Sequence, residues 1–224
     1  MSTKKLTPFV LILTALASSP LVANAENLLQ PAGFDSTQPG SEIGEPWRIR
    51  TRGEHTAIVA KAPDGDASKD WAYIKDLDGV EKVYMQTDFS PISSGVLSFR
   101  LFFPNPDATV GIYLRNSELD KSACNIVEFK SLEGSGNIYV GANGNRQRLP
   151  VKISGPEYMQ FDIEFSATDA GEKIDVYIID TSGRHLIHST TEPTAHPVDT
   201  VMITTDTKTE LTEFYVGQLA LNRS

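Results

Sequence analysis

Apolar and polar residues alternate along four short runs between Ser94 and Asn143. In the first run every second residue is apolar, at Leu97, Phe99, Leu101 and Phe103. The same spacing recurs at Val110, Ile112 and Leu114, at Val127 and Phe129, and at Ile138 and Val140. A period of two places all apolar side chains of a run on one side of an extended chain. The four runs are therefore predicted to be antiparallel strands, each with one buried face.

Ten further runs of the same kind cover most of the remaining chain. They lie at residues 47–51, 56–61, 71–75, 82–89, 148–153, 158–167, 173–180, 186–190, 200–205 and 214–221. The segments between them are rich in glycine, proline, asparagine and aspartate, which tight turns prefer. No segment shows a sustained helical period with capping residues. Between twelve and fourteen short strands without a helix predict an all-β, two-sheet antiparallel β-sandwich.

The first 25 residues have the pattern of a secretory signal peptide. Its features, in order, are a basic start at Lys4 and Lys5, an apolar stretch at residues 9–16, and the A-x-A cleavage motif Ala23-Asn24-Ala25. The apolar stretch is too short to span a bilayer. We therefore expect cleavage before Glu26 and a secreted or periplasmic protein. Residues 26–224 are predicted to form a single domain, because that length suits one sandwich and no linker-like stretch divides it.

Net charge and cysteine content narrow the classes of partner. The formal charge is −9, and removal of the two signal-peptide lysines makes it −11. An acidic chain repels phosphate backbones, so we expect no nucleic-acid partner, and we expect no membrane span. Cys124 is the only cysteine, which rules out an intramolecular disulfide and predicts a partly buried thiol. The oligomeric state is left open by the sequence.

Several of these runs resemble the strand motifs of a known superfamily. The run from Phe89 to Leu101 has the form F-s…s-G-x-l-s-F-x-l, and Ile112 to Asn116 has the form i-x-l-r-n. Weaker matches lie at residues 27–35, 158–165, 173–178 and 214–221. Together they resemble the concanavalin A-like lectin/glucanase superfamily, with its LamG-like jelly rolls, over nearly all of residues 26–224. The resemblance implies a jelly roll in which the concave sheet face is the usual glycan groove.

One departure from this superfamily concerns metal binding. The closing strand commonly carries an acidic residue that helps to hold a structural calcium ion, and this chain has Gly217 there. Asp35 alone cannot supply the several oxygen ligands that calcium needs, so such a site is left open but unsupported. The four histidines do not cluster by spacing, which argues against zinc. We therefore predict no metal site and no cofactor.

The outward positions of the central strands form a candidate ligand surface. If these strands are neighbours in chain order, one sheet face carries Arg100, Phe102, Tyr113, Arg115, Glu128, Lys130 and Tyr139. Aromatic rings stack on the apolar faces of sugars, and arginine forks pair with carboxylates, so this set would suit an acidic polysaccharide. The alternative interpretation is a solvated sheet face whose cations pair with acids such as Glu128.

Motifs for catalysis are missing from the expected strands. The superfamily's retaining glucanases carry an E-x-D-x-x-E strand, whereas this chain has only Asp162 and Glu164, which are better interpreted as a solvated strand face. The R-x-E-x-R and Q-x-H strands of alginate-lyase-like relatives do not occur either. We therefore predict no catalytic residue and an exported, non-catalytic carbohydrate-binding or surface-interaction module. A lyase or glycosidase with an unfamiliar site, and a structural or adhesion protein of the envelope, remain the alternatives.

Overall fold

The structure of the protein is a computed structural model. It describes residues 27–29, 34, 38–51, 53–61, 63, 70–77, 82–131, 135–205 and 212–224. The predicted signal peptide, its cleavage point before Glu26, and Asp35 lie outside the described residues. Within the described residues, no helix is long and apolar enough to cross a bilayer.

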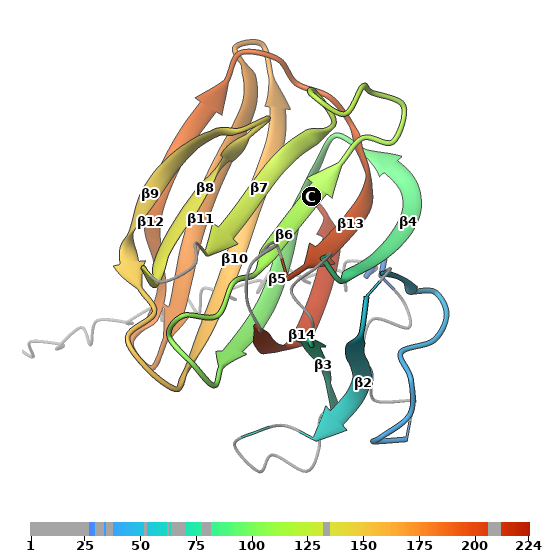
Figure 1. The fold of residues 1–224 in the computed structure, drawn as a ribbon. Coiled ribbons are helices and arrows are strands. Elements are labelled where there is room, and N and C mark those ends of the chain that lie inside the picture. Colours follow the sequence, from blue (N-terminus) through green and yellow to red (C-terminus); the bar gives the residue numbers. More distant parts are fainter. Residues whose placement is uncertain are drawn as a thin grey trace, which may run out of the picture.

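Fourteen strands in the described part of the chain form two antiparallel sheets, which pack face to face as two layers (Figure 1). Sheet I contains, in spatial order, β1 (Arg48–Arg50), β4 (Tyr84–Ile92), β13 (Val198–Thr204), β6 (Gly111–Arg115), β7 (Asn125–Ser131), β8 (Asn137–Ala142) and β9 (Asn145–Lys152). Sheet II contains β12 (Gly183–Glu192), β11 (Gly171–Asp180), β10 (Glu157–Thr168), β5 (Ser94–Phe103), β14 (Glu213–Arg223), β3 (Asp70–Asp76) and β2 (His55–Lys61). The two-sheet antiparallel β-sandwich expected from the sequence is confirmed.

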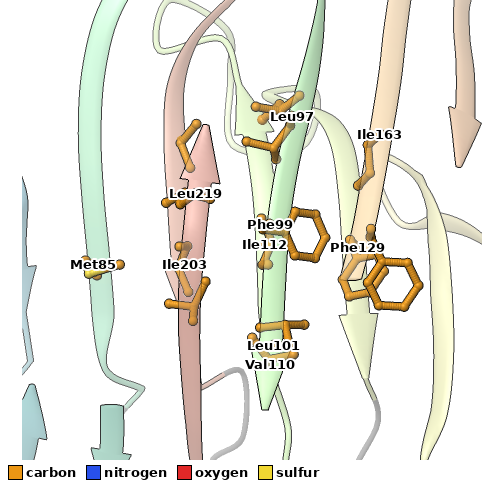
Figure 2. Close-up of a cluster of buried hydrophobic side chains, with 14 of the residues drawn as sticks. Met85, Leu97, Phe99, Leu101, Val110, Ile112, Phe129, Ile163, Ile203 and Leu219 are labelled. Atoms are coloured by element: carbon orange, nitrogen blue, oxygen red, sulfur yellow. The ribbon is translucent and has the colours of Figure 1, made fainter. Parts of the chain in front are cut away.

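The core lies between the two sheets and is built from the alternating residues that the sequence pattern predicted to face inward (Figure 2). Phe129 of β7 in sheet I meets Phe99 of β5 and Phe161 of β10 in sheet II, with ring centroids 5.1 and 4.9 Å apart. All three rings are fully buried. Burial of one such ring contributes about 3 kcal/mol, so these contacts hold the two layers together.

The order of strands in space differs from their order in the chain. The strand β5 pairs with β10 and β14, whereas β6 pairs with β13 and β7. The segment between Phe103 and Gly111 therefore crosses from sheet II to sheet I. The assumption that the four central strands are successive neighbours holds for β6, β7 and β8 and is wrong for β5. The two outer faces of the sandwich consequently carry different parts of the predicted ligand surface.

A cleft on the outer face of sheet I

The outer face of sheet I carries the outward residues of five neighbouring strands. The register pairs Met202 of β13 with Tyr113 of β6 and with Gln86 of β4. Cross-strand partners share a sheet face. Since Ile112 and Ile203 point into the core, Tyr113 and Met202 point away from it. Arg115, two residues beyond Tyr113, lies on this same outer face.

An open cleft of about 1070 Å³ lies over this face at the β4 side of the sheet. The outward side chains of sheet I that line it are Arg50, Tyr84, Gln86, Arg115 and Met202. The opposite wall comes from β2 and the segments before it, with Glu42, Ile43, Thr51, His55, Thr56, Ala57 and Ile58. Within this wall, the segment before β1 is joined to β2 by backbone hydrogen bonds. The Val59 N–H, for example, donates to the Ser41 carbonyl at 2.9 Å.

Arg115 is held in place in this cleft by three acceptors, none of which is a carboxylate. Its Nε donates to Asn125 Oδ1 at 3.1 Å, one Nη donates to Cys124 Sγ at 2.9 Å, and the other donates to Met202 Sδ at 3.7 Å. Thioether and thiol sulfurs are weak acceptors. Among the described residues no carboxylate forms an ion pair with Arg115. The guanidinium is therefore oriented without being neutralised.

The charges of the lining are opposite in sign to those of the whole chain. Three cationic side chains, Arg50, Lys82 and Arg115, line the cleft, and Glu42 is the one carboxylate among its described lining residues. The chain as a whole has a formal charge of −9. A concave surface with a net positive charge raises the local concentration of anionic ligands. The cleft is therefore suited to an anion, although the rest of the surface is not.

The remaining predicted residues of sheet I lie on the same outer face, outside the cleft. Tyr113 and Lys130 are buried there, and Tyr139 is partly exposed. Glu128 is also buried, and its carboxylate accepts hydrogen bonds from Arg146 Nε at 2.6 Å, Asn125 Nδ2 at 2.8 Å and the Gly144 N–H at 3.2 Å. This carboxylate thus fixes the turn between β8 and β9 and the Asn125 amide that supports Arg115.

The other two predicted residues are on the far side of the molecule. Arg100 and Phe102 belong to β5 in sheet II and face outward from it, because Leu101 between them is buried in the core. The prediction that all seven residues share one sheet face is therefore wrong. The structure brings together five of them on sheet I and separates the remaining two.

Sequence reasoning missed Tyr84, Gln86, Met202 and the β2 wall as parts of this cleft. The alternating runs at 82–89 and 200–205 do place Tyr84, Gln86 and Met202 on one parity. That parity shows which residues point outward but not which strands are adjacent. The adjacency of β13 to both β4 and β6 was the missing information.

Asp162 and Glu164, the acids examined for glycosidase chemistry, face outward from sheet II. Arg184 donates to both carboxylates, at 2.7 and 2.6 Å, and lies 3.4 Å above the centroid of the Tyr177 ring. Tyr177 also donates to Glu164 at 3.2 Å. Both acids therefore lie on the outward face of β10, as predicted, and Arg184 pairs with both of them there.

Comparison with known proteins identifies the fold. No protein-family model matches the chain, and no curated protein matches it. A sialidase structure aligns with a TM-score of 0.63 and 14% identity, over 86% of this chain and 18% of its own. Crh5 transglycosylase in complex with NAG aligns at 0.55 and 14%, over 80% and 79%. The Bacillus licheniformis β-glucanase aligns at 0.53 and 10%, over 83% and 96%.

At these identities the alignments show the fold and leave the activity undetermined. The chain corresponds to less than a fifth of the sialidase and to most of the other two structures. All three alignments span both sheets of the sandwich, because each covers at least 80% of this chain. The chain has the concanavalin A-like jelly-roll fold.

Proposed function

We propose that the protein is a non-catalytic glycan-binding module that takes an acidic polysaccharide into the sheet I cleft. The observation that carries this proposal is the Arg115 guanidinium, which is oriented by an amide oxygen and two sulfur atoms and is paired with no carboxylate of the described residues. A planar guanidinium in a fixed orientation can form two parallel hydrogen bonds to the carboxylate or sulfate of a sugar. Arg50 adds a second guanidinium to the same cleft.

Recognition of the sugar ring itself falls to the neutral side chains of the lining. Tyr84 offers an aromatic ring to an apolar sugar face, and Gln86 offers an amide that both donates and accepts hydrogen bonds. Tyr113 is too deeply buried to present its ring face. The stacking role proposed from the sequence therefore passes from Tyr113 to Tyr84, with Tyr139 as a partly exposed neighbour on the same sheet face.

Binding fits this cleft better than glycoside hydrolysis does. Hydrolysis of a glycosidic bond normally needs two carboxyl groups on opposite sides of the bond. Glu42 is the one carboxylate among the described lining residues, and the buried Glu128 is committed to Arg146 and Asn125. Export of the protein, which the sequence predicts, would bring the cleft to extracellular or periplasmic polysaccharides.

Arg115→Gln should weaken retention on immobilised alginate or polygalacturonate at least tenfold. Loss of a charge-assisted hydrogen-bond pair costs about 1.5–3 kcal/mol, and 1.4 kcal/mol corresponds to a factor of ten. Retention is measured by affinity electrophoresis at low salt. Arg223→Gln is the matched control, because it removes one exposed arginine at the end of β14, outside the cleft. Equal loss in both variants, or no loss in Arg115→Gln, would contradict the assignment of the cleft.

A polyuronate lyase is the second candidate function. The cleft places a tyrosine, Tyr84, and a histidine, His55, along the same surface as Arg115. A lyase needs a cation to neutralise the uronate carboxylate and a base to remove the adjacent proton. Release of unsaturated oligosaccharides from alginate or polygalacturonate would favour this function over binding alone.

A further inference from the structure

Four aromatic residues form a continuous row across the outer face of sheet II. This aromatic row consists of Tyr73 on β3, Tyr215 on β14, Phe102 on β5 and Tyr158 on β10, which are successive register partners. Their ring centroids are separated by 4.6, 5.8 and 4.7 Å. The separations follow the spacing of neighbouring strands, about 4.8 Å. The row thus places one ring on each of four adjacent strands, on the outer face of sheet II and not on the sheet I face that carries Arg115.

The other half of the same outer face has a different composition. On β10, β11 and β12 the outward side chains combine the ion-paired Arg184–Asp162–Glu164 network with the isolated apolar or aromatic side chains of Tyr177, Ile179 and Leu186. The aromatic row lies beside this network, on β3, β14, β5 and the start of β10, and places its rings in direct contact with one another. A contiguous group of partly exposed rings marks an interaction surface more often than a solvated one.

The row is supported from its own side of the sheet, because Trp71 has the same strand parity as Tyr73 and points outward from sheet II with it. Trp71 of β3 is almost fully buried and lies across Gly217 of β14, where a Cβ atom would come within 2.5 Å of the indole. Its ring meets that of Tyr158 edge to face, with centroids 5.9 Å apart. The Arg100 guanidinium lies 4.5 Å from the Tyr158 centroid and 5.8 Å from that of Trp71. These contacts fix the rings before any ligand arrives, which lowers the entropy cost of binding.

We propose that the aromatic row binds a neutral polysaccharide chain that lies across the four strands. The exposed area favours a narrow ligand over a protein. Each ring is exposed by no more than about a third, so the four together offer on the order of 300 Å². A specific protein interface needs about 800 Å² from each partner. A single glycan chain, which presents one sugar face at a time, matches the smaller area.

The charges at the β3 end of the row are balanced. At its β3 end, Glu213 accepts hydrogen bonds from Tyr73 at 2.5 Å and forms an ion pair with Lys75 at 3.2 Å. These two charges cancel, and the carboxylate and ammonium remain able to meet sugar hydroxyl groups. Apolar C–H faces of the sugars would stack on the rings while the hydroxyl groups reach the polar margin.

The test uses barley β-glucan, laminarin and galactomannan as soluble neutral probes in affinity electrophoresis. The expected result is retardation of the protein by at least one of them. Tyr215→Leu keeps apolar bulk on the strand but removes the ring from the middle of the row, and it should weaken that binding about tenfold. Tyr215→Phe keeps the ring and should retain most of the affinity. Thermal melting of each variant shows whether the fold is intact.

A matched variant on the other side of the molecule separates this proposal from the one for the cleft. Arg115→Gln should leave neutral-polysaccharide binding unchanged, and Tyr215→Leu should leave acidic-polysaccharide binding unchanged. The proposal is overturned if none of the three probes retards the protein, or if folded Tyr215→Leu binds as the parent does. It is also overturned if the protein is a dimer by sedimentation and Tyr215→Leu makes it a monomer, because the row would then be a protein interface.

Discussion

Glu172→Gln should stabilise the protein at alkaline pH by about 3 kcal/mol. Glu172 on β11 has the same parity as Ile174 and Val176, so it points into the sandwich with them. The side chain is 1% exposed, and neither carboxylate oxygen accepts a well-formed hydrogen bond. This burial raises the pKa of Glu172 from 4.5 to about 7, although the nearby backbone of His196 opposes the shift in part. A buried carboxylate without a partner penalises the folded state once it is ionised.

The sign of the pH dependence follows from proton binding. Between pH 4.5 and about 7 the folded protein holds the Glu172 proton more tightly than the unfolded chain does. Its contribution to stability is therefore fully present below pH 4.5 and is lost as the pH rises through 7. A difference of this size between the folded and unfolded pKa values corresponds to about 3 kcal/mol. Glutamine has the same shape and never ionises, so the variant lacks this loss.

Urea unfolding of both proteins at about pH 4, below both pKa values, and at about pH 8.5, above both, measures the effect. The two free energies of unfolding should agree at the lower pH and diverge at the higher one. His188 contributes a slope of opposite sign, because burial lowers its pKa. The comparison is therefore made between parent and variant at each pH, where the histidine term cancels. If the free energies of unfolding of parent and variant differ by the same amount at both pH values, Glu172 does not titrate as described.

The inward faces of the strands could be predicted from the sequence because burial leaves a local signal. Leu97, Phe99, Leu101 and Phe103 alternate with polar or smaller residues, and all four are fully buried in the structure. The pleat of a strand dictates this alternation without reference to any other part of the chain. The same reasoning correctly placed Asp162 and Glu164 on an outward strand face.

The neighbours of each strand could not be predicted in the same way, and the candidate site depended on them. The strand β5 takes its partners from β10 and β14, far along the chain. Alternation is identical for any neighbour, so it could not separate Arg100 from Arg115. The contact between Arg115 and Met202 joins residues 87 positions apart. The cleft therefore emerges only once the order of strands in each sheet is known.

Gly217 is a single position whose role also could not be predicted without knowing its neighbours in space. From the sequence, this glycine stood out as the loss of an acidic residue that helps to hold calcium in the superfamily. In the structure, the space that a side chain would fill is occupied by the indole of Trp71, on the adjacent strand β3. A carboxylate at this position would displace the tryptophan. Steric fit to Trp71 thus gives a physical reason for the glycine, whether or not the chain binds calcium elsewhere.

Gly217→Ala should destabilise the protein by about 2 kcal/mol. The added Cβ would lie 2.5 Å from Trp71 Cδ2 and 2.8 Å from Cε2, and these atoms belong to a rigid, buried ring. Forcing a ring out of a packed site costs about 1–3 kcal/mol. Alanine also restricts the unfolded chain, which offsets roughly 0.4–1 kcal/mol of that cost. Urea unfolding of parent and variant at a single pH gives the difference directly.

A double-mutant cycle assigns the cost to the tryptophan. In a Trp71→Ala background the indole is gone, so Gly217→Ala should be neutral or slightly stabilising there. Gly155→Ala is the matched control, because no atom lies within 4 Å of the Cβ that alanine would add at that turn. If Gly217→Ala costs the same with and without Trp71, the clash with the indole is not its cause. The need for glycine at this position beside the aromatic row would then have to be explained by another contact.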